Sequence, residues 1–180
     1  LEDILNSGQR PKMEEYEKQL FITMNIPVII DNSVIIEQVS LFIGENFILS
    51  FYSGDQDHFD PLRARIRNKI GRIRYKKSDY LIYCLLDLII DHGYPVLEQF
   101  GDKIEDIETT LINSTARQQT LAEIHHIKKE LLLLRRSIWP QRELMNNLLR
   151  DDHDLIKKDT LIYLRDCYDH TIQMMELIEA

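Results

Sequence analysis

Three apolar stretches occupy the first third of the chain, and each is bounded by residues that form turns. They span residues 20–30, 34–43 and 47–52, and Asp-Asn-Ser and Gly-Glu-Asn separate them. Runs rich in Ile, Val and Phe between such turns predict an antiparallel meander, entered through an irregular segment at residues 9–12. Because three strands leave a sheet edge and one sheet face uncovered, we expect further strands upstream.

The pattern changes to the 3–4 spacing of helices after an Asp-Pro pair at residues 60–61, which is a helix-start signal. We predict a first helix from this pair to about residue 75 and a long helix that begins at residue 78. Gly-Tyr-Pro at residues 93–95 interrupts the long helix. We expect a kink there, because proline lacks an amide hydrogen and crowds the preceding turn.

A second long helix is predicted after a polar loop at residues 113–115. It continues to about residue 150, with a bend expected at Trp139-Pro140. A third helix begins near residue 159 and runs to the end of the chain. Its apolar positions follow a 3-4-3-4-3 spacing and form one stripe: Leu161, Leu164, Tyr168, Thr171, Met175 and Ile178. Strands followed by helices, without alternation, predict an α+β fold in which two of the helices form an antiparallel hairpin.

The composition is that of an acidic globular protein. The chain is 44% hydrophobic, and Asp plus Glu outnumber Lys plus Arg by 30 to 22, which gives a net charge of −8. An acidic surface disfavours nucleic acid and suits cations or basic partners. No apolar run approaches the ~18–20 residues that cross a bilayer. The chain starts without Met and its last helix lacks a cap, so we expect both termini to be cuts in a larger protein.

The two cysteines, Cys84 and Cys167, are far apart and lack the spacing of a zinc finger. Each lies among helix-forming residues. We therefore expect two small, buried, free thiols, which fits a reducing compartment.

Two groups of acidic residues are candidates for metal chemistry. Asp87 and Asp91 are one helical turn apart, and Leu and Ile surround Asp87. A carboxylate in that setting must be protonated, paired or metal-bound, because burying it alone is costly; a partnered aspartate on a polar stripe is the alternative. Asp166, Asp169 and His170 are spaced as metal ligands would be on one helix, or as a solvated flank would be.

The remaining motifs give weaker evidence of function. Glu123 and His126 have the Glu-x-x-His spacing of di-iron bundles, but the required second copy is absent, so surface histidines are expected. Residues 63–77 hold eight Lys and Arg, which we interpret as a solvated face or as partners of acidic helices. No phosphate-binding loop or nucleophile motif stands out, so no enzymatic activity is predicted.

Several segments together resemble the cytoplasmic part of the CorA family of magnesium and cobalt channels. Trp-Pro at residues 139–140 and Arg-Asp-Cys-Tyr-Asp-His at residues 165–170 are the most specific. The resemblance is collinear over essentially the whole chain, through residues 1–6, 9–12, 59–63, 79–83, 132–135, 138–143, 148–151 and 163–170.

This resemblance implies a homopentamer whose cytoplasmic domain is an α/β sandwich with a helical hairpin and a stalk helix. Residues 1–77 would be the sheet-containing part without its first strands, residues 78–150 the hairpin, and residues 151–180 the start of the stalk. The stalk would lead to membrane segments beyond Ala180 that hold the pore. The location implied is the inner cell membrane, with this domain in the cytoplasm.

The resemblance also implies regulatory metal sites between subunits. Glu2 and Asp3 of one subunit and Asp166 of the next would bind Mg²⁺, with Asp87 as a further carboxylate, and Co²⁺ would substitute. Ion binding would favour the closed state. Two alternatives stay open: a zinc-transporting relative with the same fold, and a coiled-coil scaffold that needs no ion.

Overall fold

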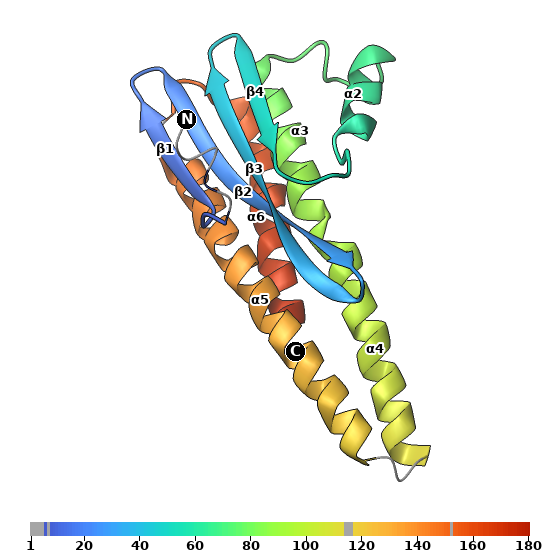
Figure 1. The fold of residues 1–180 in the computed structure, drawn as a ribbon. Coiled ribbons are helices and arrows are strands. Elements are labelled where there is room, and N and C mark those ends of the chain that lie inside the picture. The colour runs from blue at the N-terminus through green and yellow to red at the C-terminus, as the bar shows by residue number, and fades with distance from the viewer. Residues whose placement is uncertain (1–5, 7, 114–116, 152) are drawn as a thin grey trace.

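The computed structural model describes residue 6 and residues 8–113, 117–151 and 153–180 (Figure 1). Its first third is a four-stranded antiparallel sheet in which sequential strands are neighbours. The strands are β1 (Lys12–Tyr16), β2 (Gln19–Ile30), β3 (Ser33–Gly44) and β4 (Phe47–Tyr52). Helices follow, so the predicted α+β fold is confirmed.

The three predicted strands correspond to β2, β3 and β4, but the sequence missed β1. The prediction placed an irregular segment at residues 9–12, directly before the first strand. The five residues of β1 read Lys-Met-Glu-Glu-Tyr, and their charges do not suggest a strand. β1 forms because each of its residues pairs with β2, from Lys12↔Thr23 to Tyr16↔Gln19, and this pairing overrides the weak local preference.

The helices are α2 (Asp60–Arg67), α3 (Ser78–Asp91), α4 (Gly93–Asn113), α5 (Arg117–Arg150) and α6 (Lys158–Glu179). The Asp-Pro start of α2 is confirmed, with proline in the first turn. The prediction that this helix reaches residue 75 is wrong. Lys69 and Gly71 have φ values of 56° and 73°, and a chain that turns left-handed at these positions cannot continue the helix.

The interruption predicted at residues 93–95 is confirmed, since α3 ends at Asp91 and α4 begins at Gly93. Glycine is needed at this point because a Cβ atom on Gly93 would lie only 2.4 Å from Met174 Sδ in α6. The junction therefore lets α3 and α4 approach α6 closely. In contrast, α5 continues as one helix through Pro140.

Together, α3 and α4 are long and apolar enough to span a membrane on length and composition alone, over Ser78–Ile112. The expectation that no stretch of this chain approaches such a span was therefore too strict. However, 56% of the apolar window is buried inside this fold. Packing in a protein core accounts for the hydrophobicity of a helix buried in this way.

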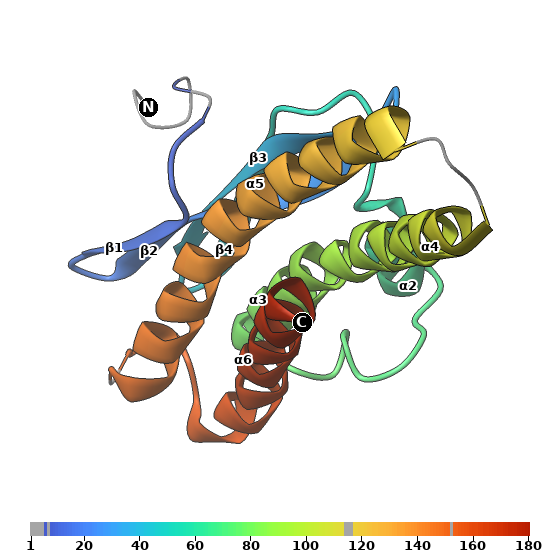
Figure 2. The same cartoon turned by 90° about the horizontal axis from the view of Figure 1, so that it is seen from below.

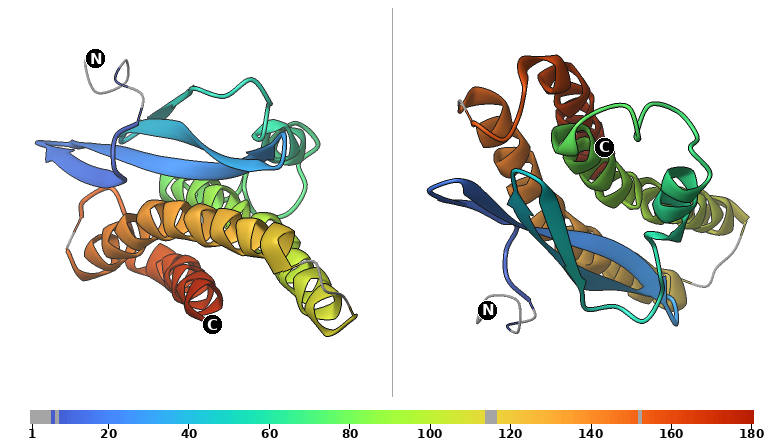
Figure 3. Two further views of the ribbon diagram at one scale, coloured as in Figure 1. Left: turned by 60° about the horizontal axis from the view of Figure 1, so that its bottom comes forward. Right: turned by 90° about the horizontal axis from the view of Figure 1, so that it is seen from above.

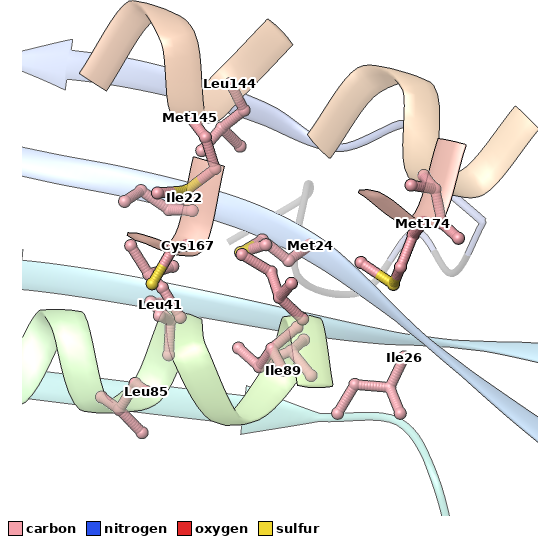
Figure 4. Packing of buried hydrophobic residues seen from close by; sticks show 14 of the residues in the cluster. Ile22, Met24, Ile26, Leu41, Leu85, Ile89, Leu144, Met145, Cys167 and Met174 are labelled. Atoms are coloured by element: carbon pink, nitrogen blue, oxygen red, sulfur yellow. The ribbon is translucent and has the colours of Figure 1, made fainter. Parts of the chain in front are cut away.

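One face of the sheet packs against helices, as the ribbon views show (Figures 2 and 3). The core combines side chains from the sheet and from α3, α5 and α6 (Figure 4): Ile22, Met24, Leu41, Leu85, Ile89, Leu144, Met145, Cys167 and Met174. On the opposite face, Phe47, Leu49 and Phe51 are exposed. The final helix buries its predicted stripe at Leu164, Thr171 and Met175 and half-buries the rest.

The turn between β2 and β3 holds the far end of the sheet on the helical hairpin. Asp31 and Asn32 have φ values of 48° and 67°, which suit a two-residue turn between twisted strands. Lys103 Nζ in α4 donates to Asn32 Oδ1 at 2.6 Å. The amide of Val34 donates to the buried Glu130 carboxylate of α5, also at 2.6 Å.

A buried carboxylate fixes the start of α6 against the start of α3. Asp79 is only 4% exposed, and its Oδ2 accepts hydrogen bonds from the Thr160 hydroxyl at 2.6 Å and the Lys157 amide at 3.2 Å. It thereby binds donors that the first turn of a helix leaves unpaired, and its charge suits the positive end of the helix dipole.

We expect Asp79→Ala to lower the free energy of unfolding by about 1–3 kcal/mol, because the buried donors of Lys157 and Thr160 lose their partner. Urea denaturation measures the change. Asp159→Ala is the matched control, since it removes an exposed carboxylate from the same helix turn and costs at most about 1 kcal/mol. Equal losses in the two variants would contradict the role given to Asp79.

Candidate metal centre

Helices α3 and α6 run side by side in the same direction (Figure 2). Three contacts between them show the register: Asp79 with Thr160, Asp87 with Cys167, and Asp91 with His170. These pairs are separated by 81, 80 and 79 residues. A nearly constant separation means that each turn of α3 meets the corresponding turn of α6.

Metal-binding side chains meet near the C-terminal end of α3. Asp87, Asp91 and His170 each offer one ligand atom, and these atoms lie within 4.8 Å of one another. His170 Nδ1 is 3.1 Å from Asp91 Oδ1. Asp87 and His170 are half-buried and Asp91 is exposed, so the group lies where the core meets solvent.

Burial and a neighbouring negative charge both raise the pKa of Asp87. Burial raises the pKa of the Asp87 carboxyl group, and the nearby Asp91 carboxylate raises it further. The His170 ring and hydrogen bonds from Cys167 and Tyr83 oppose this rise in pKa. The ionised form of Asp87 is thus disfavoured by its surroundings, and a bound cation would relieve that cost.

Neighbouring groups fix the ligand side chains. The Cys167 thiol donates to Asp87 Oδ1 at 3.7 Å. Burial, and then the Asp87 charge, raises the pKa of both Cys167 and Tyr83, so both stay protonated near neutral pH. Tyr94 donates to the backbone carbonyl of His170 at 3.3 Å, and its ring meets the imidazole edge-on at 5.8 Å.

Solvent reaches the carboxylates through a pocket of about 290 Å³ between α2 and α3. Asp87 and Asp91 line it together with Arg65 and His92. An ion could therefore reach Asp87 without rearrangement of the core.

This donor set fits a divalent cation. Carboxylate oxygens suit Mg²⁺, which keeps several waters and uses few protein ligands. An imidazole suits transition metals such as Co²⁺ or Zn²⁺. The group can thus hold a hydrated Mg²⁺ through carboxylates alone, or a transition metal with His170 added.

The structure brings one of the predicted site residues into this group. Asp87 belongs to it, whereas Asp166 is exposed on α6 and makes no hydrogen bond or ion pair with another described residue. Glu2 and Asp3 lie outside the described residues. The spacing of one helical turn had marked Asp91, after Asp87, and His170, after Asp166, as candidates for metal chemistry, but the resemblance assigned neither of them to a site.

Comparison with known proteins places the chain in a family. The model of the family described as CorA-like Mg²⁺ transporter protein matches residues 1–180. The chain belongs to the CorA-like family. The cobalt/magnesium transport protein CorA of Thermotoga maritima is 41% identical over 182 residues, which are 100% of this chain and 52% of that protein. The protein of the same name from Methanocaldococcus jannaschii is 22% identical over 174 residues, 96% of this chain and 54% of that protein.

The chain therefore spans about half the length of these CorA relatives. Solved structures agree on the fold. The soluble domain of CorA from Methanocaldococcus jannaschii has a TM-score of 0.83 at 20% identity, covering 96% of this chain and 68% of that one. The ZntB cytoplasmic domain from Vibrio parahaemolyticus has a TM-score of 0.81 at 14% identity, covering 99% and 70%. At these identities the CorA and ZntB structures establish the fold alone.

The raised pKa of Asp87 predicts a pH-dependent stability in the absence of divalent ions. A carboxyl group whose pKa is higher in the folded than in the unfolded protein makes the folded state less stable as pH rises. The reason is that, between these two pKa values, the folded state binds more protons than the unfolded state. We expect Asp87→Asn to raise the melting temperature at pH 7, and the gain to vanish below the ordinary carboxyl pKa of about 3.9. Thermal unfolding with a chelator measures it.

Asp159→Asn is the control, because it removes an exposed carboxylate and should give no such gain. An Asp87→Asn protein that melts at or below the temperature of the parent at pH 7, in chelator, would contradict the electrostatic account of Asp87.

Proposed function

We propose that this chain is the cytoplasmic, divalent-cation-sensing part of a CorA-type magnesium and cobalt channel. The observation that carries the proposal is the meeting of Asp87, Asp91 and His170 across two parallel helices. Membership of the CorA-like family supports it, as does a relative named as a cobalt/magnesium transport protein. Its role is regulatory, and no catalytic step is assigned to it.

The physical basis is repulsion relieved by a cation. Without an ion, burial and the nearby Asp91 carboxylate disfavour the charged form of Asp87. A bound Mg²⁺ would neutralise this charge, and an ion that also binds His170 would join α3 to α6. An ion shifts a conformational equilibrium only by its difference in affinity for the two states, so the ion must bind the closed state more tightly. High internal Mg²⁺ would then close its own path into the cell.

We extend the proposal to sites between subunits of a homopentamer. Glu2 and Asp3 of one subunit would share an ion with Asp166 of the next. The exposure of Asp166, and the absence of a hydrogen-bonding or ion-pairing partner for it among the described residues, support a role toward a neighbouring molecule. The pentamer would be anchored in the inner membrane by segments outside this chain.

The proposed pentamer implies an organisation for the full protein. Residues 1–77 contribute the sheet-containing part, residues 78–150 the long helical hairpin, and residues 151–180 the start of the stalk that couples to the pore. Mg²⁺ is the proposed regulatory ion and Co²⁺ can take its place, since carboxylates and an imidazole accept both.

The first test measures Mg²⁺ binding by calorimetry. We expect Asp87→Asn and Asp91→Asn each to weaken binding by about tenfold or more, because each removes a charged ligand. His170→Ala should weaken Co²⁺ binding more than Mg²⁺ binding, since Mg²⁺ prefers oxygen ligands. Asp159→Asn removes the same charge far from the group and should leave both affinities unchanged. Binding of both ions that none of the three site variants alters would refute the proposed centre.

The second test concerns the sites between subunits. In the full-length channel, Asp3→Ala with Asp166→Ala should relieve the inhibition of the current by internal Mg²⁺, because the shared ion loses its ligands from both sides. Patch recording at several internal Mg²⁺ concentrations measures the change, with Asp159→Ala as the control. Unchanged inhibition in the double variant would rule out regulation through this pair and leave the centre at Asp87 as a separate question.

A further inference from the structure

A second pocket lies away from the candidate metal centre, between α5, the sheet and residues 8–10, which lead into β1. Its volume is about 770 Å³, within the range of about 300–1,000 Å³ that is usual for sites of small molecules. It shares no lining residue with the pocket beside Asp87. The proposed metal chemistry therefore gives this second pocket no role.

The charged side chains that line this second pocket are all basic. They are Arg10, Arg135 and Arg136, and the described residues around the pocket include no Asp or Glu. Arg135 pairs with Glu179 at 3.3 Å, whereas Arg10 and Arg136 form no ion pair within the described part of the chain. In a chain of net charge −8, this is a local reversal of charge. Because a guanidinium group matches phosphate with two parallel hydrogen bonds, the pocket suits an anion that carries phosphate.

Ser137 adds a buried polar group that the fold leaves unsatisfied. This residue lines the pocket and is only 4% exposed, and its hydroxyl group has no hydrogen-bond partner among the described residues. A buried hydroxyl group without a partner costs free energy. A ligand that forms a hydrogen bond with Ser137 would remove that cost.

An aromatic ring lies beside these donors. Trp139 lines the pocket and is 41% exposed, and the neighbouring Leu132 and Leu133 are exposed as well. The indole N–H of Trp139 donates to Glu143 Oε1 at 3.1 Å, and the Arg142 guanidinium lies 5.6 Å from the ring centre. These contacts hold the indole in place, and a flat aromatic ligand can stack on such a ring.

We propose that this pocket binds a nucleoside phosphate. The phosphate group would bind Arg10 and Arg136, the Ser137 hydroxyl would donate to a phosphate oxygen, and the base would stack on Trp139. The volume and the exposed indole favour a nucleotide over a bare phosphate ion, which would fill only the basic part of the pocket. The proposal is independent of the proposed metal-sensing function, because the two pockets have no residue in common.

The experiment uses the fluorescence of Trp139, which is the only tryptophan in the sequence and so reports on this pocket alone. The purified chain is titrated with ADP, with inorganic phosphate and with adenosine. A chelator is present, so that no metal ion joins ligand and protein. We expect ADP to change the fluorescence and to bind at least about tenfold more tightly than phosphate or adenosine, because only ADP engages both the arginines and the indole.

Three variants test the assignment by calorimetry. Arg136→Gln should weaken ADP binding by about tenfold, because it removes a charged donor to phosphate. Ser137→Ala should weaken ADP binding by a smaller factor without lowering the melting temperature, because the hydroxyl group has no partner to lose in the fold. Arg150→Gln is the matched control. It removes the same charge from an exposed position on α5 outside the pocket and should leave the affinity for ADP unchanged.

Each contrary result has a distinct meaning. No fluorescence change at millimolar ADP, in protein that circular dichroism shows to be folded, would overturn the proposal. Inorganic phosphate that binds as tightly as ADP would overturn the assignment to a nucleotide. Equal weakening by Arg136→Gln and Arg150→Gln would show that general surface charge attracts ADP, and would overturn the site. None of these results bears on Mg²⁺ binding at Asp87, which is measured separately.

Discussion

The parallel packing of α3 against α6 is the constraint on which the candidate centre depends. Asp79 sets the register at one end by accepting hydrogen bonds from Thr160 and the amide of Lys157. Because both helices have the same rise per residue, this register is carried down their length. Asp87 then meets Cys167, and Asp91 meets His170, without a further element to align them.

Parallel neighbours need a long connection, and the α4–α5 hairpin supplies it. The hairpin is held to the rest of the fold through the turn at Asn32 and through the core. Gly93 allows the break between α3 and α4 to approach Met174, which keeps α6 close to both helices. The break thus places Tyr94 against His170, so the irregular point of the helix also orients a ligand.

The centre combines an electrostatic cost with a means of relieving it. Asp87 is half-buried beside a second carboxylate, and its raised pKa expresses the cost of keeping it charged. A bound cation would remove that cost, and one that also binds His170 would join α3 to α6. In the proposed function, binding of such an ion would couple ion occupancy to helix packing through the same few side chains, as a sensor requires.

Much of this molecule is determined by the sequence alone. The apolar stretches and turns of residues 20–52, the Asp-Pro start of α2, the break at Gly93 and the apolar stripe of α6 follow from local chemistry, and the structure confirms them. β1 was missed because its charged residues form a strand only when paired with β2, and α2 was overestimated because Lys69 and Gly71 turn left-handed.

For the site, the spacing within one helix pointed to Asp87 with Asp91, and to Asp166 with His170. Which of these side chains meet across the two helices depends on the rotation and register of α3 against α6. Packing of the core and the hydrogen bonds of Asp79 fix those two quantities, and no local pattern contains them. Tertiary structure therefore brought Asp87, Asp91 and His170 together and left Asp166 exposed and outside this group.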